Sequence, residues 1–173
     1  MLAEFEARGE ALNAVRILRL LSLTGARRGE IVELKWSEID FERGFLRLDK
    51  TKSGKSIRPI SGAAQKLLAE APREHSVWVF PDANGKGPYQ GTPKIWRKVR
   101  TAAGLEDFRM HDLRHSFASF GAENGLSLPV IGALLGHKNT STTQRYAHLT
   151  DHAARQAAND VSDMVAEALG VSQ

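Results

Sequence analysis

The sequence of 173 residues contains no cysteine, so it can form neither disulfide bonds nor thiolate metal sites. It has no apolar run close to the roughly 20 residues that a membrane-spanning helix needs. Residues 1–6 (MLAEFE) are acidic and lack the basic-then-apolar order of a signal peptide. We therefore expect a cytoplasmic protein with no membrane partner.

The sequence also lacks a large excess of charge of one sign, because it has 24 Lys and Arg against 20 Asp and Glu. A net charge of +4 says little by itself about a polyanionic partner. The basic residues are nevertheless concentrated in 47–58 and 94–100, while acidic residues gather towards both ends. Such clusters are either solvated faces or parts of a nucleic-acid interface, and charge alone leaves both open.

Length and a hydrophobic content of 42% are sufficient for one domain with its own core. Apolar residues at helical spacing and residues that favour helix ends indicate a mainly helical chain. Helices are predicted over 11–24, 28–36, 61–71, 92–103, 111–124, 127–136, 143–147 and 151–169.

Two short segments alternate apolar and polar residues, 45–49 clearly and 56–60 less cleanly. Residues 53–55 (SGK) between them predict the turn of a β-hairpin. Residues 77–80 (VWVF) are ended by Pro81 and fit a third strand beside it. The predicted class is α+β, mainly α-helical, with a small antiparallel three-stranded sheet.

The first stretch with chemical potential is 24–30 (TGARRGE). A glycine turn between two helices can place a guanidinium near a helix start, where backbone N–H groups favour anions. Taken alone, Arg27 would be interpreted as a surface residue of that turn.

A second stretch, 111–119 (HDLRHSFAS), places His111 and Arg114 on one helix face. His111 and His115 also have the spacing of a zinc-binding helix. The metalloprotease pattern needs glutamate after the first histidine, where this chain has Asp112. We therefore expect no metal site.

The third stretch is 134–148 (LLGHKNTSTTQRYAH), with His137 and Tyr146. Each of these residues alone would be read as structural. Residues 54–56 (GKS) resemble the end of a phosphate-binding loop, but Asp49 replaces the required glycine and a strand follows. We expect neither ATP nor any other cofactor.

Together the motifs TGARRGE, TKSGKS, HDLRHSFAS and LLGHKNTSTTQRYAH, in this order, resemble those of the tyrosine recombinase (phage integrase) family. The resemblance covers about residues 11–150 and implies the DNA breaking-rejoining fold of its catalytic domains. It also implies a site-specific DNA recombinase or integrase. The catalytic residues that it implies are Arg27, Lys52, His111, Arg114, His137 and Tyr146.

In this family Tyr146 would attack a DNA phosphodiester, giving a 3′-phosphotyrosyl intermediate and a free 5′-hydroxyl before strand exchange and religation. No ATP or metal is needed because the ester keeps the bond energy. Arg27 and Arg114 would hold the non-bridging oxygens through paired N–H donors.

The remaining roles follow from the chemistry of the transfer. His111 is expected to accept the tyrosine proton and His137 to donate to a non-bridging oxygen. Lys52 would protonate the departing 5′-oxygen, with Lys55 as the alternative. Supporting roles are expected for Glu30 and His115.

The expected partner is duplex DNA. The residues predicted to contact it are Lys55, Arg58, Lys94, Arg97 and Lys98. We further expect self-assembly into a tetrameric synapse on DNA, DNA-bending accessory proteins, and a bacterial or phage-encoded protein associated with the nucleoid.

We expect residues 1–173 to form a single catalytic domain without the N-terminal core-binding domain usual in the family, and hence to bind DNA weakly. Helix 151–169 is expected to dock either on a neighbouring protomer or on its own domain. Two other interpretations stay open: a type IB topoisomerase-like enzyme and a non-catalytic DNA-binding prophage remnant.

Overall fold

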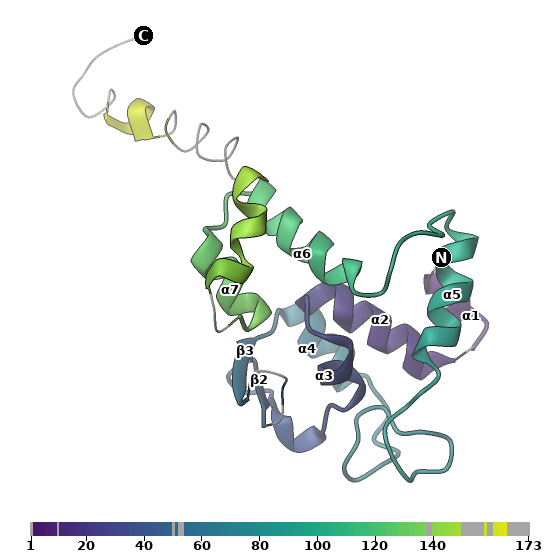
Figure 1. Ribbon diagram of the computed structural model, residues 1–173. Coiled ribbons are helices and arrows are strands. Elements are labelled where there is room, and N and C mark those ends of the chain that lie inside the picture. Colours follow the sequence, from purple (N-terminus) through teal and green to yellow (C-terminus); the bar gives the residue numbers. More distant parts are fainter. Residues whose placement is uncertain are drawn as a thin grey trace.

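The computed structural model describes residues 2–9, 11–49, 51, 54–137, 140–149, 158 and 161–165 (Figure 1). Its α-helices are α1 (Leu2–Ala7), α2 (Leu12–Thr24), α3 (Arg28–Val32), α4 (Gly62–Ala69), α5 (Thr92–Ala102), α6 (Asp112–Glu123) and α7 (Leu128–Leu135). The 3₁₀ helices are η1 (Trp36–Glu38), η2 (Thr140–Thr142) and η3 (Gln144–Leu149). The strands are β1 (Ile39–Asp40), β2 (Phe45–Leu48) and β3 (Ser56–Pro59).

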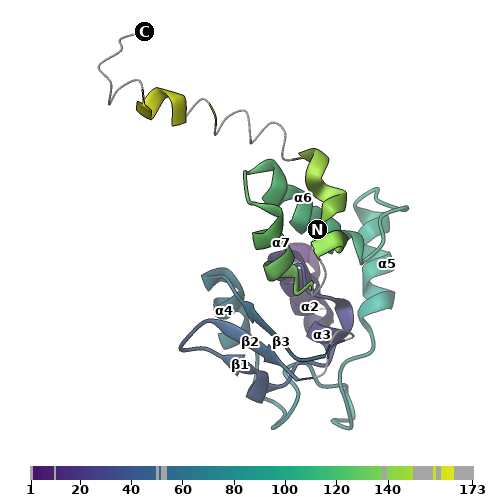
Figure 2. The same ribbon diagram turned by 60° about the vertical axis from the view of Figure 1, so that its left-hand side comes forward.

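Helix α2 is the centre of the larger hydrophobic core. It is buried on most of its circumference and packs against α1, α3, α4, α5 and α6. Figure 2 shows α2 between α4 on one side and α5 on the other. The apolar side of such a helix must be enclosed in this way, because its exposure would leave apolar surface in water.

The turn after α2 lets α6 approach closely. Gly25 ends α2 with φ 59°, and its N–H donates to the carbonyl of Leu21. A Cβ at this position would lie 2.6 Å from Cδ1 of Phe117 on α6. Glycine is needed here both for the left-handed backbone and for the absence of a side chain.

The sheet has three antiparallel strands in the order β1-β2-β3, and the predicted hairpin is formed by β2 and β3. The prediction of 77–80 as the third strand is wrong. These residues pair with the segment after α3, through the bridge of Lys35 with Trp78. The short turn between β1 and β2 explains the difference, since a local pairing closes a smaller loop.

Register decides which side of the sheet is buried. Leu46 of β2 is paired with Arg58 of β3, and both are buried. Ile57, the next residue towards the hairpin turn, is 61% exposed. Because strand side chains alternate between faces, the register turns the arginine inward and the isoleucine outward.

The tyrosine-bearing segment belongs to a second, smaller core. Ala118 and Ala122 of α6, Ile131 and Leu135 of α7, and Tyr146 of η3 form this cluster. The predicted helices correspond to the observed ones within a few residues, although 28–36 is divided into α3 and η1. Of the predicted helix 151–169, most lies outside the described residues, and Val161–Val165 are helical.

Within the residues that the structure describes, no helix is both long and apolar enough to span a membrane.

Candidate active site

Arg27 stands at the N-terminal end of α3, directly after the glycine turn. Its backbone N–H donates to Glu30 Oε2 (2.7 Å) and its Nη1 donates to Glu30 Oε1 (3.0 Å). The Arg27 side chain keeps 27% of its surface exposed, whereas that of Glu30 keeps 4%. Glu30 therefore holds Arg27 in place while part of the Arg27 side chain stays open to a ligand.

Arg114 of α6 joins two helix ends that are far apart in the sequence. Its Nη1 donates to the carbonyl of Gly25 (2.7 Å) and its Nη2 to that of Leu135 (2.9 Å). Burial, and after it the charges of Arg27 and Arg58, lower the pKa of Arg114 to about 10. The guanidinium is thus still charged at neutral pH, and Arg27 and Arg114 together are called the arginine clamp below.

His137 follows the left-handed Gly136 that ends α7. Its Nδ1 is hydrogen-bonded to the Thr143 hydroxyl at 2.9 Å. Burial first, and then the charges of Arg114 and Arg27, lower the pKa of His137 to about 4, so the ring is neutral at pH 7. With Nδ1 occupied by Thr143, Nε2 is the nitrogen left for a ligand.

Tyr146 is 5% exposed, and its hydroxyl is hydrogen-bonded to His115 Nδ1 at 2.7 Å. Burial raises its pKa, and the charges of Arg145 and Arg114 oppose that rise. Burial also lowers the pKa of His115, so a neutral imidazole faces a protonated phenol. His115 therefore contacts the Tyr146 hydroxyl directly, whereas only a supporting role was expected for it.

His111 lies at the start of α6, with its ring edge-on to that of His115 and 5.1 Å from it. Burial and then the nearby His115 lower the pKa of His111. The hydrogen bond to the tyrosine is made by His115, whereas His111 was expected to accept the tyrosine proton.

The predicted lysine, Lys52, lies outside the described residues. Lys55 is exposed and forms an ion pair with Asp49 (3.4 Å). The structure therefore brings together Arg27, Arg114, His137, Tyr146 and the two histidines of α6.

Arg58 requires a correction. It was predicted to contact DNA from the surface, but it is 2% exposed and its Nη2 donates to Glu30 Oε1 at 2.6 Å. Its position opposite Leu46 on the buried face of the sheet is the reason. The sequence held one signal that Arg58 faces inward. Ile60, two residues further along and hence on the same side of the chain, is also buried.

The basic residues of α5 border a surface pocket of about 460 Å³ that continues towards the start of α6. Two of the residues predicted to contact DNA, Lys94 and Arg97, line this pocket. A third, Lys98, is exposed on the same helix. Arg28, Arg100 and Arg109, none of which had been assigned to DNA, complete its basic lining around Trp96.

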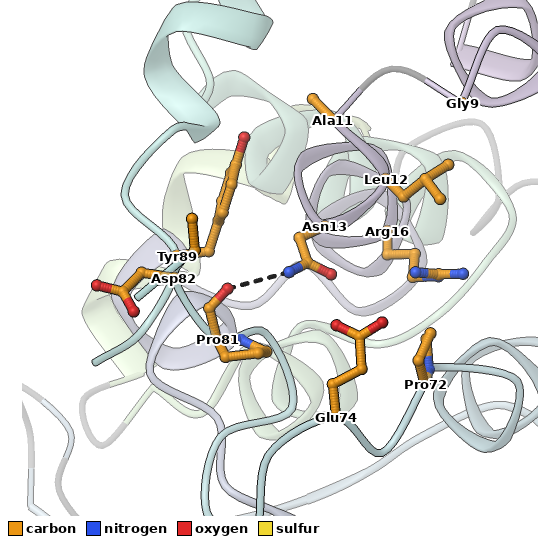
Figure 3. Close-up of a pocket in the computed structure, with 11 residues that line it drawn as sticks. Gly9, Ala11, Leu12, Asn13, Arg16, Pro72, Glu74, Pro81, Asp82 and Tyr89 are labelled. Carbon is orange, nitrogen blue, oxygen red and sulfur yellow. Dashed lines mark hydrogen bonds between the residues drawn. The ribbon is translucent and has the colours of Figure 1, made fainter. Parts of the chain in front are cut away.

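Another pocket, of about 390 Å³, lies beside the first turns of α2 (Figure 3). Asn13 and Arg16 face Glu74 and Tyr89 there, and Asn13 Nδ2 donates to the carbonyl of Pro81 (3.1 Å). No residue predicted for catalysis or DNA contact lines this pocket. Among the residues described, no three His, Cys, Asp or Glu side chains come close enough to hold a metal ion.

The phage integrase family model matches residues 2–153. The integrase of Salmonella phage P22 is 31% identical over 150 residues, covering 75% of this chain and 39% of that protein. Tyrosine recombinase XerA of Pyrococcus furiosus is 35% identical over 151 residues, covering 82% and 52%. The chain thus spans about half or less of the length of these relatives.

A solved structure shares the fold. The Tn1549 transposon integrase in complex with transposon right end DNA superposes with a TM-score of 0.75 at 18% identity, covering 93% of this chain and 62% of that one. The expected arrangement of helices around a small antiparallel sheet is therefore the fold of this chain.

Proposed function

Because the chain belongs to the phage integrase family of tyrosine recombinases, we propose that it breaks and rejoins DNA through a covalent bond between Tyr146 and a backbone phosphate. The observation that carries the proposal is the surroundings of the Tyr146 hydroxyl. A neutral histidine lies at hydrogen-bond distance, and the charge of Arg114 acts on the same hydroxyl. These are a base and a charge-stabilising group for an oxygen nucleophile.

The attack begins with loss of the phenol proton. Burial raises the pKa of Tyr146, so the hydroxyl needs a base in order to react at neutral pH. His115 Nδ1 is the atom in contact and accepts the proton as the Tyr146 oxygen bonds to phosphorus. His111, edge-on to His115, supports that ring.

The arginine clamp and His137 act on the phosphate. Negative charge accumulates on the non-bridging oxygens of the pentavalent transition state, where fixed guanidinium donors are most effective. Arg114 is held by two backbone carbonyls and Arg27 by Glu30, so neither has to reorganise during the reaction. His137 donates from Nε2 in the tautomer whose Nδ1 accepts the Thr143 hydroxyl proton.

The bond between phosphorus and the 5′-oxygen breaks as the tyrosine ester forms. We assign the proton for that oxygen to Lys52, with Lys55 as the alternative. The ester retains the energy of the broken bond, so the reverse attack by a 5′-hydroxyl rejoins DNA without ATP or metal. Strand exchange would proceed between copies of the protein assembled on DNA as a tetramer, with DNA-bending proteins assisting.

The basic pocket beside α5 is proposed as the track of the DNA backbone towards the clamp. Arg109 and His111 are two residues apart, so the pocket and the candidate site adjoin along the chain. Arginine and lysine neutralise phosphates without reading sequence, which fits a role in affinity and register.

Nicked suicide substrates made from the repeats that flank the gene provide the test. Incubated with the chain without metal or ATP, they are expected to yield a covalent adduct on denaturing gels, mapped to Tyr146 by mass spectrometry. Tyr146→Phe lacks the attacking oxygen and should give no adduct. An adduct that survives in Tyr146→Phe, or none from the wild-type chain fused to a family core-binding domain, would contradict the proposal.

A further inference from the structure

Arg58 is a buried charge that the proposed chemistry does not use. Its Nη2 pairs with Glu30 and its Nε donates to the Ser56 hydroxyl at 3.3 Å. Its Nη1 is buried without a partner among the described residues. A buried ion pair is weak support for stability, because desolvation offsets much of the attraction. The arrangement therefore invites a role other than holding the fold together.

The Glu30 carboxylate connects Arg58 to the arginine clamp. Glu30 Oε1 accepts from both Arg27 Nη1 (3.0 Å) and Arg58 Nη2 (2.6 Å), and Oε2 accepts from the Arg27 backbone N–H (2.7 Å). The two arginines thus share one oxygen of the carboxylate, and its other oxygen is held by the Arg27 backbone. Movement of Arg58 would release Glu30 and with it the direction of the Arg27 side chain.

Arg58 is itself held in place by the backbone turn at the end of α7. A Cβ on Gly136 would lie 2.6 Å from Arg58 Nε and 2.8 Å from Cζ, so the guanidinium lies directly against that backbone. Gly136 also has φ 65°, a conformation that glycine adopts readily. Arg58 is therefore held between α3 and the turn that presents His137.

We propose that Arg58 is a positioning residue of this site, which sets the direction of Arg27 through Glu30 and thereby the rate of DNA cleavage. This inference rests on the proposed function. A misplacement of about 1 Å in a catalytic group can cost about 100-fold in rate. Lysine at this position would keep the charge but lose the planar fork that reaches Glu30 while resting on Gly136.

The main test compares Arg58→Lys with Arg19→Lys in the full chain. Arg19 forms a partly exposed pair with Glu6 at the same N–O distance of 2.6 Å, between α2 and α1. Single-turnover adduct formation is expected to fall about 10- to 100-fold in Arg58→Lys, measured at saturating DNA so that a change in DNA affinity does not contribute. Arg19→Lys should keep the wild-type rate. A folded Arg58→Lys with wild-type rate, or with weaker DNA binding alone, would overturn the inference.

A double-mutant cycle separates positioning from mere stability. Glu30→Gln combined with Arg58→Met removes both buried charges together, which avoids an unpaired charge if Arg58→Met alone does not fold. If Arg58 acts through Glu30, the double variant should be about as slow as Glu30→Gln alone. Rates that fall by the product of the two separate effects would show that Arg58 does not act through Glu30.

Inorganic phosphate provides a readout that does not depend on cleavage. Titrated into the wild-type chain and followed by the Arg27 Nε–H resonance in NMR, it should bind, and bind several-fold more weakly in Arg58→Lys. If no adduct forms but phosphate binding still depends on Arg58, the proposed function fails and the positioning role stands. Equal phosphate affinity in both proteins, or none in the wild type, would overturn the positioning role.

Discussion

Single residues at this site owe their direction to contacts made by residues from other elements. Arg114 is aimed by the carbonyls of Gly25 and Leu135, and Arg27 by Glu30. Burial raises the pKa of the Tyr146 phenol. It lowers the pKa of His115, to which that phenol is hydrogen-bonded. Burial thus acts on both partners so that each is uncharged before the reaction.

At the same scale, Gly136→Ala should destabilise the protein more than Gly104→Ala. Both glycines have φ 65°, but a Cβ on Gly104 meets nothing within 4 Å. The left-handed backbone should cost about 1–2 kcal/mol in each variant. The clash with Arg58 should add about 1–3 kcal/mol in Gly136→Ala alone. Urea denaturation measures the difference, and equal losses would show that Arg58 does not press on that turn.

At the scale of elements, α5 combines two faces with different tasks. Ile95 and Val99 are buried and the helix packs on α2, while Lys94, Arg97 and Lys98 are exposed. The apolar face fixes the orientation in which the basic residues are presented. The same helix therefore serves the core and, in the proposed function, the DNA backbone.

Lys94→Gln and Arg97→Gln should each weaken duplex binding uniformly across DNA sequences. Each should also lower the slope of log affinity against log salt by about 1, because one phosphate contact is lost. Lys66→Gln on α4 is the matched control, since α4 and α5 lie on opposite sides of α2. Fluorescence anisotropy over a salt series measures the slopes. Equal slopes for Lys94→Gln, Arg97→Gln and Lys66→Gln would show that α5 does not contact DNA.

At the scale of the whole molecule, the site lies where two hydrophobic clusters meet. The larger cluster includes α2 and the sheet, and the smaller one consists of α6, α7 and η3. Arg114 joins the end of α2 to the end of α7, and Arg58 joins β3 to α3 and α7. Site geometry and the packing of the clusters on one another are therefore coupled.

Acid should consequently reduce the stability of the whole domain. The pKa of His137 is lowered to about 4, and those of His111 and His115 are lowered too. From about pH 6.5 down to 4 the unfolded chain binds protons that the folded chain refuses, so the free energy of unfolding falls. His137→Asn should make this fall smaller in denaturation series at pH 7 and 4.5. An unchanged pH dependence would contradict the lowered pKa of His137.

Much of this protein follows from local sequence. The spacing of apolar residues and the glycines at helix ends predicted α2, α6 and α7 closely, and Ser61 as N-cap predicted α4, because such signals act within a few turns. The hairpin of β2 and β3 followed from alternation around a glycine turn. The order of four motifs also indicated the family, which the match over residues 2–153 shows.

Only the tertiary structure decided which side chains meet. The register of β3 turned Arg58 inward and Ile57 outward, although hydrophobicity alone favours the reverse. The edge strand of the sheet is β1 and not 77–80, and the residue in contact with the tyrosine hydroxyl is His115 and not His111. These outcomes depend on which segments pair and pack against one another in three dimensions, and the local pattern of residues does not by itself decide that choice.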